Sequence, residues 1–218
     1  MRKGCELVRV VDLTHVIRRE MPVYPGTPLP ELSAASTWER DGFHETRLTL
    51  YSHIGTHMDA PAHLFSSGVT LDALPPECFV GTALVIPCGG AGPVLHMDVL
   101  ASLRAAADRA DYLLFHTGWD RLWGQAAYFE GYPVPGEDVV DYLLTSGKKG
   151  VGLDAVSVDP VGDGDLPNHR RLLGGGLVIL ENLTNLAAVG CGLFTLCALP
   201  LHYEDADGAP VRAVGLWL

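Results

Sequence analysis

A histidine-rich segment is the part of the chain best suited to chemistry. His53, His57, Asp59 and His63 fall within residues 53–63. Imidazole and carboxylate ligands suit zinc, manganese or iron, whereas calcium and magnesium prefer shells of oxygen alone. In an extended chain all four side chains would point to one side, because their positions differ by even numbers. The spacing favours a metal site, and a set of surface-loop histidines is the alternative.

The backbone geometry restricts how these groups could meet. On a helix, which turns by ~100° per residue, Asp59 would lie ~200° from His57. In a straight strand His53 and His57 would stand ~13 Å apart, too far to share one ion. The chain must therefore bend, and Gly55 is the residue that permits a bend. We expect the strand at 46–52 to lead into a kinked loop whose concave side carries the candidate ligands.

Two distant residues are further candidates. His169 ends the polar segment 163–169, which we expect to be an exposed loop in which a histidine needs no special role. Glu181 directly follows an apolar run, at the end of a strand that should be buried. An unpaired carboxylate is costly in such a place. A salt bridge to an arginine, such as Arg170 or Arg47, is the alternative explanation for Glu181.

The elements that would position these groups are mostly short strands. Strands are expected at 6–14, 46–52, 79–87, 111–117, 150–158 and 176–180, helices at 98–109 and 136–146, and a hairpin at 196–218 with a tight Asp-Gly turn. The mixture predicts one α/β (α+β) domain over residues 1–218, with a strand-rich core and two or three helices.

Composition excludes several classes of protein. The chain has 218 residues, of which 48% are hydrophobic and 19% charged, so it is neither disordered nor collagen-like. Its formal charge of −11 argues against nucleic-acid partners and against docking on anionic membranes. The longest apolar stretch, 187–201, is interrupted by glycines and falls short of the ~20 residues of a membrane helix. We therefore expect a soluble cytoplasmic protein.

The five cysteines are Cys5, Cys78, Cys88, Cys191 and Cys197. No pair has the C-x-x-C spacing of zinc ribbons or thioredoxin-like motifs. We expect buried free thiols in a reducing compartment.

The segment 53–63 resembles the H-x-G-T-H-x-D-x-P-x-H signature of the metal-dependent cyclase family, which includes bacterial kynurenine formamidase and isatin hydrolase. Other segments match family segments in the same order, namely 12–15, 21–26, 68–74, 117–119, 154–159, 181–186 and 210–213. The resemblance thus covers nearly the whole chain. It implies a compact β/β/α fold, assembled as a homodimer or homotetramer.

The resemblance also implies roles for the candidate residues. In kynurenine formamidases two histidines and the aspartate of the motif hold the first metal, and they correspond here to His53, His57 and Asp59. That aspartate also reaches a second metal, together with a later histidine and glutamate, whose places His169 and Glu181 fit. One or two zinc ions per subunit are expected, with manganese as the alternative.

Two further residues concern the reaction itself. His63 falls where the family has its proton donor and acceptor. Tyr24 stands where the formamidases carry a tryptophan that touches the aromatic substrate, although ordinary loop packing would also explain this tyrosine. The sequence departs from many members at Leu64, which separates His63 from Phe65. These departures concern the substrate and leave the metal ligands unchanged.

The resemblance implies a metal-dependent hydrolase of a small non-peptide amide. The substrate would be an aryl formamide such as N-formylkynurenine or a cyclic amide such as isatin. A water activated by the metal would attack the carbonyl, and His63 would act as general acid and base. One alternative is a dehydratase or cyclase of a small hydroxy-carbonyl substrate. Another is a non-catalytic metal-binding protein, which would not need His63.

Overall fold

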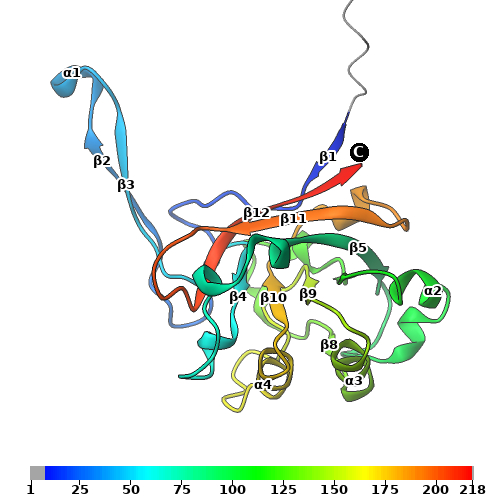
Figure 1. The fold of residues 1–218 in the computed structure, drawn as a ribbon. Helices are drawn as coiled ribbons and strands as arrows, with labels where there is room; N and C mark the ends of the chain where they lie inside the picture. The colour runs from blue at the N-terminus through cyan, green and yellow to red at the C-terminus, as the bar shows by residue number, and fades with distance from the viewer. Residues whose placement is uncertain (1–7, 218) are drawn as a thin grey trace, which may run out of the picture.

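The computed structural model describes residues 8–217, and eight of its strands form one closed sheet. The eight strands are β1 (Arg9–Asp12), β4 (His57–Asp59), β5 (Val80–Pro87), β7 (Tyr112–His116), β9 (Gly150–Leu153), β10 (Val178–Glu181), β11 (Phe194–Pro200) and β12 (Gly208–Trp217). Their order is β1-β12-β11-β5-β7-β9-β10-β4, and β4 also pairs with β12 (Figure 1). The short strand β4 therefore closes the sheet.

The continuous apolar run expected at 79–87 forms a strand that is buried on both faces. Leu84 and Ile86 of β5 belong to the hydrophobic cluster under the helices. Ala83 and Val85 belong to a second cluster, which fills the inside of the closed sheet. β5, β7, β9 and β10 run parallel, and parallel strands are normally covered on both faces in this way.

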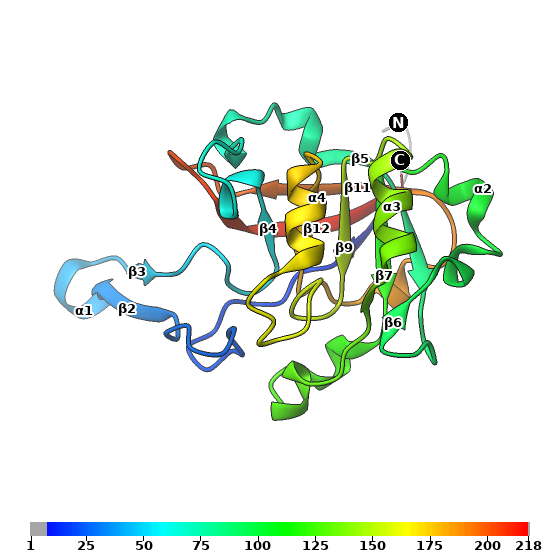
Figure 2. The same ribbon diagram turned by 90° about the horizontal axis from the view of Figure 1, so that it is seen from below.

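Two helices longer than one turn, α3 (Glu137–Thr145) and α4 (Pro167–Gly174), cover the outer face of this parallel part (Figure 2). α1 (Trp38–Asp41) and α2 (Arg104–Ala107) are single turns. The 3₁₀ turns are η1 (Pro61–His63), η2 (Leu71–Ala73), η3 (Pro76–Phe79), η4 (Met97–Leu100), η5 (Trp119–Leu122), η6 (Ala126–Phe129) and η7 (Leu186–Ala188). A small parallel pair joins β6 (Val94–Leu95) to β8 (Val134–Pro135). The expected mixed α/β class with a strand-rich core is confirmed.

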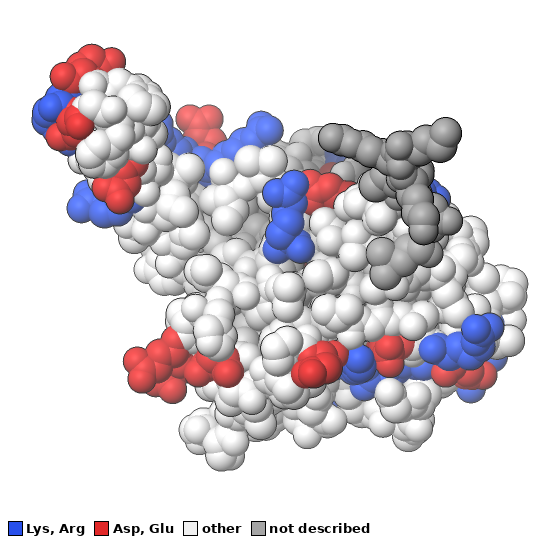
Figure 3. Space-filling view, turned by 45° about the horizontal axis from the view of Figure 1, so that its top comes forward, with Lys and Arg blue, Asp and Glu red and all other residues white. Residues whose placement is uncertain are grey.

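A hairpin of β2 (Glu31–Ser36) and β3 (Glu45–Thr49), with α1 at its tip, projects from the body of the molecule (Figures 1 and 3). We call residues 31–49 the arm. The strand expected at 46–52 lies in this arm, where every residue of β3 is exposed. The expectation that it adjoins the candidate ligands is therefore wrong, and irregular chain from 50 to 56 leads to them instead.

Three other expected elements differ in extent. The helix expected at 98–109 is broken into the 3₁₀ turn η4 and the single turn α2. The strand expected at 150–158 ends at Leu153, because Asp154 turns to accept hydrogen bonds from the backbone of Thr117 and Gly118. β11 and β12 do form an antiparallel pair, but residues 201–207 join them in place of a tight turn.

The described cysteines are all free, and their burial varies. Cys88 is buried, Cys78 and Cys197 are half-buried, and Cys191 is exposed. The expectation of buried thiols is wrong for Cys191, while Cys5 lies outside the described residues. Within residues 8–217, the helices are too short or too polar to cross a bilayer.

Candidate metal centre

The motif 53–63 bends where the sequence predicted. Gly55 has a φ of +59°, a left-handed conformation that glycine adopts without strain. After the bend, His57 and Asp59 lie on the same face of β4, so they occupy a strand and not the expected loop. Nδ1 of His53 lies 2.6 Å from Asp59 Oδ1, and Nε2 of His57 lies 3.3 Å from the same oxygen. The bend therefore brings three candidate ligands together.

A second set of groups reaches Asp59 from β10 and α4. Glu181 is the β10 residue opposite His57, and its Oε2 lies 3.5 Å from His57 Nε2. Nε2 of His169 lies 3.2 Å from Glu181 Oε1 and 3.6 Å from Asp59 Oδ2. The described ion pairs of Glu181 are with these histidines and not with Arg170 or Arg47.

His169 does not lie in an exposed loop, so that expectation is wrong. It lies in the first turn of α4 and is only 4% exposed. Pro167 begins this helix, a position that proline favours because its missing N–H needs no partner there. α4 packs beside β10, and this contact directs the His169 ring towards the centre of the site.

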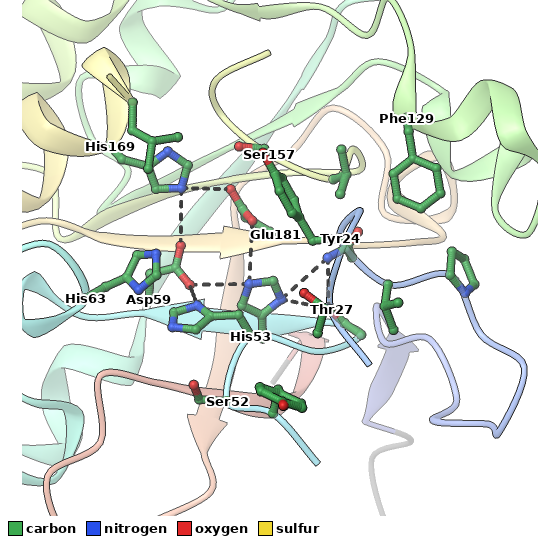
Figure 4. A pocket seen from close by; sticks show the side chains of 18 of the residues that line it. Tyr24, Thr27, Ser52, His53, Asp59, His63, Phe129, Ser157, His169 and Glu181 are labelled. Atoms are coloured by element: carbon green, nitrogen blue, oxygen red, sulfur yellow. Dashed lines mark hydrogen bonds and ion pairs between the residues drawn. The ribbon is translucent and has the colours of Figure 1, made fainter. Parts of the chain in front are cut away.

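Asp59 is the common neighbour of both sets. Its side chain is 1% exposed; Oδ1 faces His53 and His57, and Oδ2 faces His169 (Figure 4). Two groups of ligand atoms are close enough to hold an ion: His53 with His57 and Asp59, and Asp59 with His169 and Glu181. One carboxylate can therefore contact two neighbouring cations.

Hydrogen bonds behind the rings assign the tautomers of two histidines. Nδ1 of His57 donates to the carbonyl oxygen of Gly55 at 2.8 Å. Nδ1 of His169 donates to Asp159 Oδ2 at 2.7 Å, and the His169 backbone amide donates to the same oxygen. Each ring therefore presents the lone pair of Nε2 to the centre, as metal-ligating histidines do.

Sequence reasoning did not find Asp159 or Asn182. Asn182 is buried, and its amide donates to the Gly55 carbonyl that orients His57. Both residues lie within segments that matched the cyclase family, 154–159 and 181–186, and that match is the signal by which they could have been found. Asn182 contacts Gly55 across 127 positions of the chain, and Asp159, in a loop, contacts His169 in a helix. The spacing of residues in the sequence does not reveal such contacts.

The carboxylates of the site favour positive charge on the neighbouring histidines. Burial would lower the pKa of His53, but Asp59 and Asp207 outweigh it and raise that pKa to about 10. Burial acts in the same direction on His169, but Asp159, Asp59 and Glu181 raise its pKa to about 12. The pKa of Asp59 falls well below its usual value, because His53 and His57 outweigh its burial. Nitrogen and carboxylate donors that attract protons so strongly fit divalent cations, which displace such protons on binding.

The centre forms one end of a cavity of about 380 Å³. Aromatic and aliphatic side chains line much of the rest of it, among them Tyr24, Tyr51, Tyr128, Phe129 and Leu166, together with polar residues such as Ser157 and Asp163. Tyr24 is 37% exposed, and its Oη accepts a hydrogen bond of 3.4 Å from the backbone of Gly162. Figure 4 shows Tyr24 on the side of the cavity away from His63. A flat apolar group attached to a polar reacting group would match this lining.

His63 lies on η1 at the edge of the same cavity. Its ring is centred 3.9 Å from that of His53 and 6.2 Å from that of His169. Burial lowers the pKa of His63, which favours the neutral form that can accept a proton. His63 also forms a third group of possible ligands with His53 and Asp207. Geometry alone therefore permits either a proton-transfer role or a ligand role.

A fourth group of possible ligands, His116, Asp120 and Asp154, lies outside the cavity lining. Asp154 there already accepts hydrogen bonds from Thr117 and Gly118, and Asp120 accepts one from Thr184. Asp154 and Asp120 therefore have a structural role in these hydrogen bonds, which explains their positions without a metal ion.

Comparison with known proteins agrees with the geometry. The family model described as "Putative cyclase" matches residues 11–160. A kynurenine formamidase from Salinibacter ruber is 34% identical over 215 residues, which cover 94% of this chain and 96% of the relative.

Solved structures are similar over the same length. An isatin hydrolase bound to the product analogue thioisatinate superposes with a TM-score of 0.85 and 27% identity, covering 96% of this chain and 92% of that one. A potential metal-dependent hydrolase with cyclase activity has a TM-score of 0.77 and 28% identity, covering 96% and 98% of the two chains.

Proposed function

This chain belongs to the cyclase family, and we propose that it is a metal-dependent hydrolase of a small non-peptide amide. The observation that carries the proposal is the position of Asp59, whose two buried oxygens face two separate sets of ligand candidates. The relatives named kynurenine formamidase and isatin hydrolase act on an aryl formamide and a cyclic amide, and both names support an amide substrate.

Two ions fit the donor groups. His53, His57 and Asp59 would hold one ion, and Asp59, His169 and Glu181 the other. The mixture of imidazole and carboxylate donors supports zinc, with manganese as the alternative. When bound, such ions would supply Lewis-acid activation of a water molecule and of the amide carbonyl. The backbone amide of Val158 donates a hydrogen bond of 3.1 Å to Oε1 of Glu181 and so holds this carboxylate in its position as a proposed ligand.

The chain itself supplies the proton transfer. His63 lies beside the centre without being needed by either set of ligands. Its imidazole accepts a proton from the attacking water and returns it to the nitrogen of the leaving amine. A lowered pKa keeps the ring ready to accept. This assignment gives His63 a role different from that of His53 and His57, although all three are histidines of one motif.

The apolar end of the cavity supports an aryl substrate. Tyr24 and Phe129 come from different parts of the chain, and both line this end. A cavity of about 380 Å³ accommodates a small ligand. We therefore favour an aryl formamide such as N-formylkynurenine or a cyclic amide such as isatin, with Tyr24 against the ring.

Metal analysis followed by a substrate comparison tests the function. We expect one or two zinc or manganese ions per subunit and hydrolysis of N-formylkynurenine or isatin, abolished by a chelator and restored by the metal. A parallel panel of hydroxy-carbonyl compounds tests the dehydratase or cyclase alternative. Activity only on that panel would overturn the hydrolase proposal. Stoichiometric metal without any turnover would favour a metal-binding protein.

We further propose that the protein is a homodimer or homotetramer whose arm packs on a second copy. An isolated two-stranded hairpin is marginally stable in water. The arm also exposes the apolar residues Trp38, Phe43 and Leu48, each more than half accessible. Burial of these residues against a second copy would stabilise the hairpin. Light scattering should show an oligomer, and Trp38→Ser combined with Leu48→Ser should shift it towards monomer. A wild-type monomer would contradict the proposal.

We also propose a cytoplasmic location, for which the free thiols of the described cysteines are the support. Fractionation of the source cells would test it.

A further inference from the structure

The loop between β11 and β12 carries a carboxylate that the proposed function has not used. Asp207 Oδ2 lies 2.9 Å from His53 Nε2 and 3.7 Å from His63 Nδ1. We propose that Asp207 is a positioning residue of the hydrolytic site, which orients both the metal-ligand candidate His53 and the proton-transfer candidate His63. The inference rests on the proposed hydrolase function and adds a residue to it.

The side chain of Asp207 is held in place from several directions. Its backbone carbonyl accepts a hydrogen bond of 2.9 Å from the amide of Ala60, which lies within the histidine motif. The hydroxyl of Ser52 donates to Oδ2 at 3.4 Å, and the Tyr203 hydroxyl, which donates to the carbonyl oxygen of Gly208, lies 3.3 Å from Oδ1. The loop is thus tied to the motif by its backbone, and the carboxylate is oriented by separate bonds. A change of the carboxylate alone therefore leaves the backbone attachment intact.

For His53, the contact fixes which nitrogen faces the centre. Nε2 donates to Asp207, and Nδ1 points to Asp59 at 2.6 Å. His169 is held in a similar way with the two nitrogens exchanged, since Nδ1 contacts Asp159 and Nε2 faces the centre. Each of the two proposed ions would thus have one histidine backed by an aspartate. Such outer carboxylates orient the ring and raise its basicity, and their loss typically weakens metal binding about 10–100-fold.

For His63, the same oxygen favours one tautomer. A carboxylate facing Nδ1 stabilises a proton there and leaves Nε2 to exchange protons with water and with the leaving amine. It also stabilises the imidazolium that forms when His63 has accepted a proton, as a carboxylate does behind the histidine of a catalytic triad. The separation of 3.7 Å is longer than a hydrogen bond, and such contacts often tighten only when substrate is bound. Asp207 thereby connects ligand orientation to proton transfer.

The chain offers a matched control in the same loop. Asp205 carries the same charge two residues earlier, is exposed, and makes no described contact with His53 or His63. Its φ of +55° is a conformation that asparagine also tolerates. Asp205→Asn therefore removes one charge from the loop without touching the site.

The experiment compares Asp207→Asn with Asp205→Asn by two measurements. The first is the dissociation constant of zinc, measured by competition with a chelator. The second is the rate at saturating zinc with two formyl compounds, an anilide and a nitrophenyl ester. An amine must be protonated to leave, whereas nitrophenolate leaves without a proton, so only the anilide depends strongly on the general acid.

We expect D207N to bind zinc 10–100-fold more weakly and D205N to match the wild type. At saturating zinc, D207N should lose at least 10-fold in kcat on the anilide and a clearly smaller factor on the ester, because proton acceptance by His63 serves both compounds and proton donation to the leaving group serves only the anilide. Asp207→Glu, which restores the charge, should recover part of both losses. Should D207N not fold, as judged by circular dichroism, Asp207→Ser is held to the same expectations.

The outcomes separate this inference from the function on which it rests. Unchanged zinc affinity together with an unchanged ratio of the two rates would overturn the role of Asp207. Equal losses on both compounds at saturating zinc would show a general structural effect and overturn it as well. A wild-type protein that binds zinc but cleaves neither these compounds nor N-formylkynurenine or isatin would instead refute the hydrolase proposal.

Discussion

Gly208 lies directly against the imidazole ring of His53. A Cβ atom at position 208 would lie 2.4 Å from Cε1 and 2.7 Å from Nε2 of that ring. Real Cβ atoms do not approach other atoms so closely, so any side chain at 208 would have to displace the ring. The glycine that begins β12 therefore determines where a candidate ligand from another part of the chain can sit.

Gly208→Ala is expected to weaken binding of the ion held by His53, by at least 10-fold, because the ring must move. Titration with zinc in the presence of a competing chelator measures this. Gly192→Ala is the matched control, since a Cβ there meets nothing within 4 Å. Wild-type zinc affinity in G208A would show that the ring is not held where the structure places it.

Asp59→Asn is expected to lose at least one ion. The amide retains one carbonyl oxygen, whereas the carboxylate offers an oxygen to each set of ligand candidates. Elemental analysis of the purified variant gives the number of ions, with Asp98→Asn, an exposed change outside the cavity, as control. Full metal content in D59N would contradict the bridging position.

His63→Ala is expected to keep its metal and to lose 10²–10⁴-fold in kcat, the usual contribution of a positioned general acid and base. Metal analysis and steady-state rates on the same preparation test both statements. If the variant loses metal instead, His63 is a ligand, which its group with His53 and Asp207 would then explain.

Removal of metal should make stability depend on pH. The pKa of His53 is raised from its usual 6.5 to about 10 in the folded chain. The resulting stabilisation is complete below pH 6.5 and is lost as pH rises through about 10. We expect the melting temperature of chelated protein to fall over this range and that of metal-loaded protein to fall less. If the melting temperatures of the chelated and the metal-loaded protein fall equally with pH, this link between His53 protonation and stability is refuted.

The metal motif could be predicted from sequence because its geometry is local. Even spacing places His57 and Asp59 on one face of a strand, and Gly55 supplies the bend that brings back His53. The apolar run of β5 and the amphipathic helix α3 are also predictable, since burial follows directly from the pattern of apolar residues.

What could not be predicted depends on contacts between distant segments. The polar segment that ends at His169 gives no sign of burial, because α4 becomes buried only by packing beside β10. Asp207 meets His53 across 154 positions of the chain. The strand expected at 46–52 is predicted to lie beside the candidate ligands, yet its apolar Leu48 is exposed in the arm. Sequence patterns indicate the local preference of a segment, but they do not show which distant segment it will pack against.

The three residues of β4 complete the sheet and also hold two of the proposed ligands, His57 and Asp59. The same three residues therefore determine both the closure of the sheet and the position of two proposed ligands. A single substitution in β4 can therefore disturb both the closure of the sheet and the proposed metal centre.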